Sequence, residues 1–269
     1  MKKMLFSISM LICAFSLHAQ MKEGKVLYER TISFQPRQNM NPDAAANMPR
    51  SRTDRFELSF AKNQSIWEIL PDLESNDENA GGGGGGMRFM RFGGADDVTY
   101  FNFETGKRVD QRELASKTYI VEDSIRKLSW KLSGETKTVL THTARKATAQ
   151  RIGTRFIMGM ENGQMKRQEV ADTTNITAWF TTEIPVPAGP EFGGQLPGLI
   201  LELEMNNGRM VYKAVEISPK VTASNIKEPK GGKKMTAEEF TKERDKVMEE
   251  MRRNMPAGGR RRMMAGGNQ

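Results

Sequence analysis

A glycine-rich turn that runs directly into an apolar strand constrains this chain more than any other feature. It lies at residues 192–204, with the sequence FGGQLPGLILELE. Glycine tolerates positive φ and Pro197 fixes its own φ at about −65°, so residues 193–198 predict a tight turn. Leucine and glutamate then alternate over residues 201–204, as in a strand with one buried face. The stretch therefore predicts a turn that anchors a core strand.

Most of the remaining chain is also predicted to form strands. Residues 55–60 alternate apolar and polar side chains, which places Phe56, Leu58 and Phe60 on one face of a half-buried strand. Strand-forming residues are enriched in five further segments, at 25–34, 65–70, 98–103, 117–122 and 126–132. From residue 135 the pattern suits either a helix or a strand.

Two hairpins predict how these strands pair. Two pairs of strand-like segments flank an Asn-Gly turn, 155–160 with 165–170 and 199–205 with 209–217. Asn-Gly supplies the positive φ that a tight hairpin needs. We therefore expect an antiparallel sheet.

One helix and three disordered stretches complete the pattern. Residues 236–239 (TAEE) form a capping box, and an amphipathic helix is predicted from there to Asn254. Residues 35–52, residues 72–97 with their six consecutive glycines, and the Gly-, Arg- and Met-rich tail lack any apolar periodicity. Such composition is typical of disordered segments.

The amino-terminal residues are typical of a secretory signal peptide. Lys2 and Lys3 precede a short apolar run that ends before Ala19, and Ala19 is a suitable cleavage residue. The only cysteine, Cys13, lies inside this run, and the bulky Ile12 before it argues against lipid attachment there. The exported chain then has no cysteine, which excludes disulfides and thiol chemistry.

The predicted domain organisation follows from these segments. We expect a signal peptide at residues 1–19 and a β-rich domain at 20–226, interrupted by the disordered insertions 35–52 and 72–97. A linker and amphipathic helix follow at 227–254, and a disordered basic tail at 255–269. The net charge is +8, and the basic tail suits an anionic lipid or glycan surface better than nucleic acid.

The turn of residues 192–204 is accompanied by WFTTEIP at 179–185 and by Gly189-Pro190. Together these motifs resemble the GLPGLI family of secreted bacterial proteins, which is named for this turn and has no settled biochemical role. The resemblance is strongest over about residues 137–217. It implies strands in the segment where the pattern is ambiguous.

Two residues depart from the family pattern. Gln195 stands where the family motif begins with glycine, so any requirement for a left-handed conformation there is either relaxed or shifted to Gly194. Ala144 stands where relatives often carry cysteine, so any role of that thiol is absent. The expected fold class is mainly β, an antiparallel curved sheet or partial barrel with a C-terminal helix and disordered loops and tail rich in Gly and Met.

Catalytic and metal chemistry find little support in the sequence. His142 is the only histidine after the signal peptide, and no serine lies in a Gly-x-Ser-x-Gly elbow. His142 is interpreted as an exposed strand residue, no enzyme activity is predicted, and no cofactor is expected. Nineteen methionines include pairs that suit copper(I) as soft ligands. The candidate metal ligands are Met87, Met90, Met158 and Met160.

The leading functional hypothesis is a non-enzymatic exported protein of the cell envelope that binds a hydrophobic ligand or a protein partner. Its location would be the periplasm, the outer membrane or the cell exterior. The alternatives are a methionine-based copper-handling protein and a hydrolase without a recognisable motif. The candidate binding residues lie in the family turn and are Gly193, Gly194, Leu196, Pro197 and Gly198.

Overall fold

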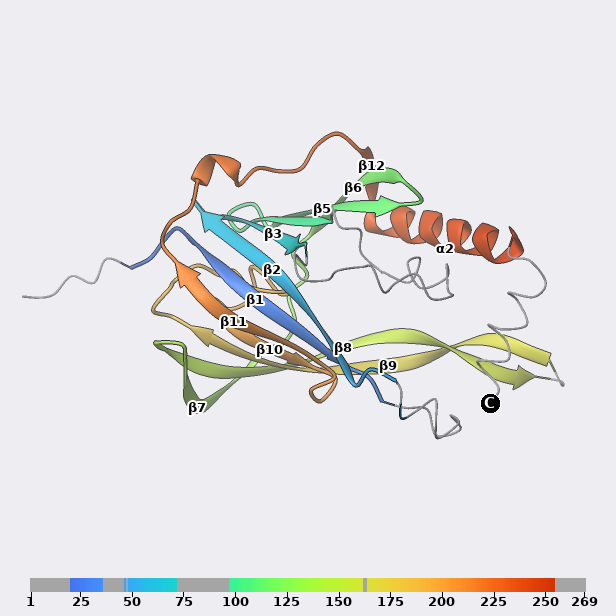
Figure 1. Ribbon diagram of the computed structural model, residues 1–269, viewed down its shortest axis with the longest axis horizontal. Coiled ribbons are helices and arrows are strands. Elements are labelled where there is room, and N and C mark those ends of the chain that lie inside the picture. The colour runs from blue at the N-terminus through green and yellow to red at the C-terminus, as the bar shows by residue number, and fades with distance from the viewer. Residues whose placement is uncertain (1–19, 36–45, 47, 72–96, 162–163, 255–269) are drawn as a thin grey trace, which may run out of the picture.

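The computed structural model describes residues 20–35, 46, 48–71, 97–161 and 164–254, without the side chains of 155–167, 252 and 254. Within these residues the chain folds into one 12-stranded sheet followed by a helix (Figure 1). The mainly β fold class is therefore confirmed. No helix in this part of the chain combines the length and the apolar character that a membrane crossing requires.

The elements have the following bounds: β1 (Gly24–Ser33), β2 (Ser51–Ala61), β3 (Gln64–Leu70), β4 (Val98–Asn102), β5 (Lys107–Leu114), β6 (Lys117–Ser124), β7 (Lys131–Val139), β8 (His142–Glu161), β9 (Gln164–Thr181), β10 (Leu199–Met205), β11 (Met210–Ser218), the short 3₁₀ helix η3 (Ala223–Asn225), β12 (Lys233–Thr236) and helix α2 (Ala237–Asn254).

The strand order is β12-β6-β5-β4-β3-β2-β1-β11-β10-β9-β8-β7. Its neighbours pair antiparallel except for β12, which pairs with β6 in parallel. The two end strands, β12 and β7, are not paired with each other, so the sheet is curved but open. Both predicted hairpins are present, as β8–β9 and β10–β11.

The face of the sheet that carries Tyr28, Phe56, Leu58 and Phe60 is called the inner face. These side chains are at most 6% exposed, which confirms the predicted alternation in β2. Aromatic rings continue the inner face across the neighbouring strands, since Trp67 stacks on Phe56 with ring centroids 5.0 Å apart. The main apolar core lies on this face.

Three parts of the chain differ from the sequence prediction. Residues 126–130 are not a strand, because their polar groups bind a side chain of another loop instead of a neighbouring strand, as described below. Strand β5 was not predicted because charged residues dominate its sequence, KRVDQREL. Strand β12 lies in the segment expected to be a linker, where it joins the sheet beside β6.

The capping box of helix α2 is present as predicted. The Thr236 amide donates to Glu239 Oε2 at 2.7 Å, and the Glu239 amide donates to Thr236 Oγ1 at 3.2 Å. Phe240 of the helix packs edge-on against Tyr119 of β6, with ring centroids 5.7 Å apart. The helix is thus attached to the β6 and β12 end of the sheet.

Candidate functional site

The family turn belongs to a long loop, residues 182–198, which we call the motif loop. The motif loop packs against the inner face and contributes five buried apolar side chains to the main core: Ile184, Val186, Ala188, Phe192 and Leu196. The apolar side chains of the loop and of the sheet are buried against each other, and the hydrophobic effect favours this burial. The inner face is therefore filled by the protein's own residues.

Backbone hydrogen bonds fix the end of the motif loop where it enters β10. The Leu199 amide donates to the Ile184 carbonyl at 3.1 Å, and the Ile200 amide donates to the Ala188 carbonyl at 2.9 Å. The Tyr28 hydroxyl, buried on β1, donates to the Ile200 carbonyl at 2.6 Å. The turn thus anchors a core strand, as its sequence predicts.

The Gln195 side chain forms hydrogen bonds that stabilise the loop, although glycine stands at this position in the motif that the sequence resembles. Its Oε1 accepts hydrogen bonds from the Leu128 amide at 3.0 Å and from Trp130 Nε1 at 3.1 Å. Gly194 before it adopts the left-handed conformation, with φ +80°, which agrees with the second of the two alternatives given above. The Gln195 side chain therefore holds residues 125–130 against the motif loop in place of a strand partner.

We expect Gln195→Ala to lower the free energy of unfolding by about 1–3 kcal/mol, because it leaves the Leu128 amide and Trp130 Nε1 without their acceptor. Urea unfolding followed by tryptophan fluorescence measures the change. The control is Gln150→Ala, whose amide makes only an exposed hydrogen bond to Asn175, and we expect a change within about 0.5 kcal/mol. Equal effects of the two variants would show that Gln195 has no such role.

A cleft of about 460 Å³ lies beside the motif loop. It is called the motif cleft, because Phe192, Gly193 and Gln195 form part of its lining. The other parts of the lining come from β4, β5, β6, residues 125–128 and β8, and the first residue of α2 also reaches it. The cleft thus joins segments that are far apart in the sequence.

Three arginines converge on the motif cleft: Arg108, Arg126 and Arg151. Two carboxylates, Asp123 and Glu191, also line it. Arg108 is bound to Asp110, with Nε 2.9 Å from Oδ2, and Arg126 forms an exposed pair with Asp123. Arg151 has no partner among the residues that the structure describes. Of the three guanidinium groups in the lining, that of Arg151 is therefore the one left free among the described residues.

Ile152, next to Arg151 on β8, adds an apolar group to this cleft. Its side chain is 81% exposed, the most exposed large apolar residue in the described part of the chain. Phe101 and Leu128 provide further apolar lining. The motif cleft therefore combines positive charge with apolar surface.

A cluster of ion pairs lies on the inner face near the motif loop. Arg112 of β5 contacts Asp97 at 3.0 Å and Asp110 at 3.1 Å. Glu191 accepts a 2.6 Å hydrogen bond from the buried Tyr212 hydroxyl, and its φ of +59° is unusual for a residue other than glycine. The charges that prevented prediction of β5 are thus paired on the inner face.

Asp54 is a second centre of charge on the same face. Arg30 donates to Asp54 Oδ2 from Nε at 3.2 Å and from Nη2 at 2.7 Å, and Arg52 donates to Oδ1. Burial raises the pKa of Asp54, but the hydrogen bonds and charges of Arg30 and Arg52 lower it by more. The net result is a pKa below the usual range of an aspartate, so this carboxyl is ionised at neutral pH.

The predicted binding residues of the turn occupy different environments. Gly193 lines the motif cleft, and a Cβ on it would lie 3.1 Å from the Phe101 ring. Leu196 and Gly198 are buried, and Pro197 is exposed. Gly194 is half-buried, against Ile125. The structure therefore brings only Gly193 of this set to the cleft surface.

The side chains of the four methionines named as candidate metal ligands lie outside the part of the chain that the structure describes. Met87 and Met90 are not among the described residues, and Met158 and Met160 lie on β8 where side chains are left aside. Among the described residues no group of three or more His, Cys, Asp or Glu side chains converges. Copper binding therefore stays a prediction.

His142 lies at the start of β8 and is partly shielded. Its Nδ1 lies 2.7 Å from Glu183 Oε2, and the Thr143 amide donates to Glu183 Oε1 at 3.0 Å. The hydrogen bonds from His142 and then Thr143 lower the pKa of Glu183. His142 does not line the motif cleft.

Sequence reasoning missed Arg108, Arg126, Arg151 and Ile152 as site residues. They come from a charged strand, a connecting segment and the long β8, and no local spacing relates them. The exposed isoleucine beside an arginine was the only local signal. Strands β5 and β8 lie far apart in the sheet order. Their residues line one cleft together with those of the motif loop.

A family model described as "Protein of unknown function (Porph_ging)" matches residues 130–202, a span that contains β7 to β9 and the motif loop. No curated protein matches the chain.

Solved structures show a likeness of fold alone. The chain is similar to PNGF-II in space group C2, with a TM-score of 0.51, 13% identity, and coverage of 84% of this chain and 33% of that one. A second PNGF-II structure in space group P21 gives a TM-score of 0.49, 14% identity and coverage of 84% and 34%. This chain therefore spans about a third of the length of the structures it resembles.

Proposed function

We propose that this chain is a non-enzymatic, exported protein of the cell envelope that binds a protein partner through the motif cleft. The observation that carries the proposal is the convergence of three arginines and the exposed Ile152 beside the motif loop. Arginine is enriched at protein–protein interfaces, whose buried centres also contain apolar side chains.

A hydrophobic ligand on the inner face is less well supported. Such a ligand would need an apolar concave surface, and the motif loop already covers this face with Ile184, Val186 and Leu196. A close-packed core has no room for a further molecule unless the loop leaves. The proposal therefore concerns the surface of the molecule.

The charge of the motif cleft indicates what kind of partner it fits. Arg151 is unpaired within the described residues, and Arg126 is paired only at the surface, with its side chain 74% exposed. Arginine binds carboxylates through two parallel hydrogen bonds. The partner is expected to present acidic groups beside an apolar side chain that contacts Ile152.

The non-enzymatic part of the proposal rests on the chemistry of the cleft. A Ser-His-Asp type of site needs a histidine beside its nucleophile, and His142 pairs with Glu183 outside the cleft lining. The strained Glu191 is held by Tyr212. This hydrogen bond links the motif loop to β11.

Site-specific photo-crosslinking tests the proposal. A benzophenone amino acid at Ile152 in the full chain, expressed in its native envelope, is expected to give one discrete product with an envelope protein. The same amino acid at Val215 of β11, which is 37% exposed, serves as the control and is expected to give none. Identical products from both positions would contradict the proposal.

Charge reversal separates specific binding from simple proximity. We expect Arg151→Glu to reduce the crosslinked product about tenfold, because it replaces attraction by repulsion, a change of about 1.4 kcal/mol or more. Lys117→Glu, an exposed position on β6 outside the cleft lining, controls for the change of net charge. An unchanged yield in Arg151→Glu would rule out the acidic partner.

A further inference from the structure

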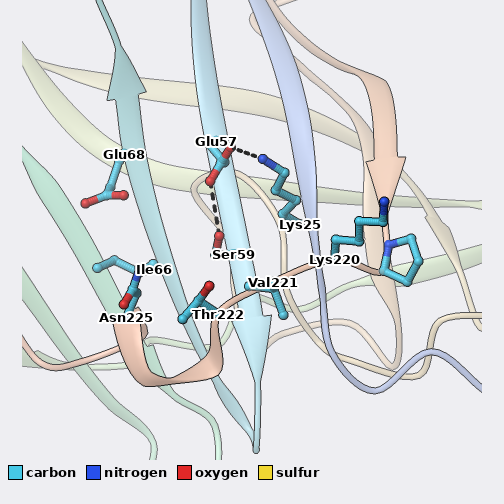
Figure 2. A pocket seen from close by; sticks show the side chains of 10 residues that line it. Lys25, Glu57, Ser59, Ile66, Glu68, Lys220, Val221, Thr222 and Asn225 are labelled. Carbon is cyan, nitrogen blue, oxygen red and sulfur yellow. Dashed lines mark hydrogen bonds and ion pairs between the residues drawn. The ribbon is translucent and has the colours of Figure 1, made fainter.

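A second cleft lies on the outer face of the sheet, opposite to the inner face (Figure 2). We call it the outer cleft. It has a volume of about 660 Å³, within the range of small-molecule sites. Its floor is formed by β1, β2 and β3, and one wall is the segment 219–225 that follows β11. None of its lining residues lines the motif cleft.

The two glutamates of the outer cleft differ in their bonding. Glu57 accepts from Lys25 Nζ at 3.1 Å and from Ser59 Oγ at 3.3 Å, so both of its oxygens are occupied. Glu68 lies directly opposite Glu57 in the β2–β3 register. It has no hydrogen bond or ion pair with any residue that the structure describes. Glu68 is therefore a carboxylate without a cation.

The position of Glu68 is electrostatically unfavourable in the free protein. Like charges directly opposite each other on neighbouring strands destabilise a sheet. Burial and then the charge of Glu57 raise the pKa of Glu68 above its usual value. A cation that binds Glu68 would remove this repulsion, so the cleft favours a positively charged group at this end.

The other end of the outer cleft carries the opposite charge. Lys220 follows β11 and has no side-chain partner within the described part of the chain. Figure 2 shows it on the side of Lys25, away from Glu68. Thr222 lies between these ends on the segment that forms the wall, and Asn225 lies farther along it, on the side of Glu68. They offer a hydroxyl and an amide, which bind peptide-like groups.

We infer that the outer cleft binds the zwitterion of a short peptide, with its ammonium group at Glu68 and its carboxylate at Lys220. The arrangement has a free anion, a free cation and a polar group between them, which matches the order of charges in such a molecule. A divalent metal fits less well, because calcium takes six to eight oxygen ligands and the Glu57 oxygens are already engaged by Lys25 and Ser59.

Triglycine and its capped forms test this inference with the full mature chain. Isothermal titration calorimetry compares triglycine, N-acetyl-triglycine and triglycine amide. We expect triglycine to bind at least fivefold more tightly than either capped form. N-acetylation removes the cation for Glu68, and amidation removes the anion for Lys220.

Two variants assign each charge to its residue. Glu68→Gln is expected to abolish the preference for a free amino terminus and to retain the preference for a free carboxylate. Lys220→Gln is expected to do the reverse. The matched controls are Glu104→Gln, in the exposed β4–β5 turn, and Lys117→Gln on β6, which should both bind like the unchanged protein.

The outcomes are distinguishable from failure to fold. Glu68→Gln removes a repulsion, so its melting temperature should equal or exceed that of the unchanged protein. Absence of triglycine binding at millimolar concentration would overturn the inference, and so would binding that is insensitive to capping. Equal loss in the target and control variants would show that binding does not depend specifically on Glu68 or Lys220 and would overturn it as well.

Discussion

Gly198→Ala is expected to lower the free energy of unfolding by more than about 4 kcal/mol or to prevent folding. A Cβ at this position would lie 2.0 Å from the Thr181 carbonyl oxygen and 2.8 Å from its carbonyl carbon. These atoms belong to the backbone of β9, which pairs with β10 at this point. Relief of the overlap would require the two strands to separate. Urea unfolding monitored by circular dichroism measures the loss.

Gly134→Ala is the matched control for this prediction. A Cβ at Gly134 of β7 would meet no atom within 4 Å, and alanine costs less conformational entropy than glycine. We expect a change of at most about 1 kcal/mol, in the direction of greater stability. If Gly198→Ala changed the free energy of unfolding as little as Gly134→Ala, the backbone of β9 could not lie as close to Gly198 as the structure shows.

The alternative role of Gly198, close approach to a partner, predicts a different result. A glycine that is needed only for binding tolerates alanine in the folded chain and loses the interaction. Here the space that a side chain would need is taken by Thr181 and Thr182 of the same molecule. The glycine that ends the family turn is thus explained by packing, whereas Gly193 alone faces the motif cleft.

Local patterns allowed much of the fold to be predicted. In β2 the alternation of Phe56, Leu58 and Phe60 with polar residues specified the buried face, because successive side chains of a strand point to opposite sides. The β10–β11 hairpin has φ +54° at Asn207 and +81° at Gly208, the conformations for which these residues are favoured. Such signals depend on neighbouring residues only.

Features that depend on distant residues were not predictable in the same way. The charged sequence of β5 resembles that of a surface segment. In the fold, however, Arg108, Asp110 and Arg112 face inward, where they are paired with one another or with Asp97. Residues 126–130 read as a strand, and only the Gln195 side chain explains why they are not one. In both cases the partner lies far away in the sequence.

The two clefts illustrate the same limit for function. Each is lined by segments whose contact depends on the order of the sheet, and neither contains a spacing that a sequence motif would record. The turn of residues 193–198 points to the motif cleft only because Gly193 and Gln195 are among the residues that line it. The outer cleft, which involves β1 to β3 and residues 219–225, had no sequence signal.

The ionic groups on the inner face give the second large expected effect. Asp54→Asn is expected to lower the free energy of unfolding at pH 7 by about 2–3 kcal/mol, because it leaves Arg30 partly buried without a counter-charge. The Asp54 side chain is 6% exposed and that of Arg30 is 21% exposed. Arg30 also lies over the Phe56 ring, 4.7 Å from its centroid, so it cannot turn to solvent without loss of that contact.

Glu29→Gln provides the control, because Glu29 forms a longer and more exposed pair with Arg55, at 3.5 Å with 57% of the arginine side chain exposed. Exposed pairs contribute about 0–1 kcal/mol. We expect Glu29→Gln to change stability by less than about 1 kcal/mol. An equal cost for Asp54→Asn would mean that the Arg30 pair is no stronger than a surface pair.

The pH dependence of Asp54→Asn gives an independent check of the same pair. The folded-state pKa of Asp54 lies below its ordinary value, so its ionised form stabilises the fold fully above the unfolded-state pKa of about 3.9. That stabilisation is lost as the pH falls through the lower folded-state pKa. The difference in unfolding free energy between the unchanged protein and Asp54→Asn should therefore be constant from about pH 7 to 5 and shrink below about pH 4. A difference that stays constant to pH 2 would show that the cost comes from packing and not from the charge of Asp54.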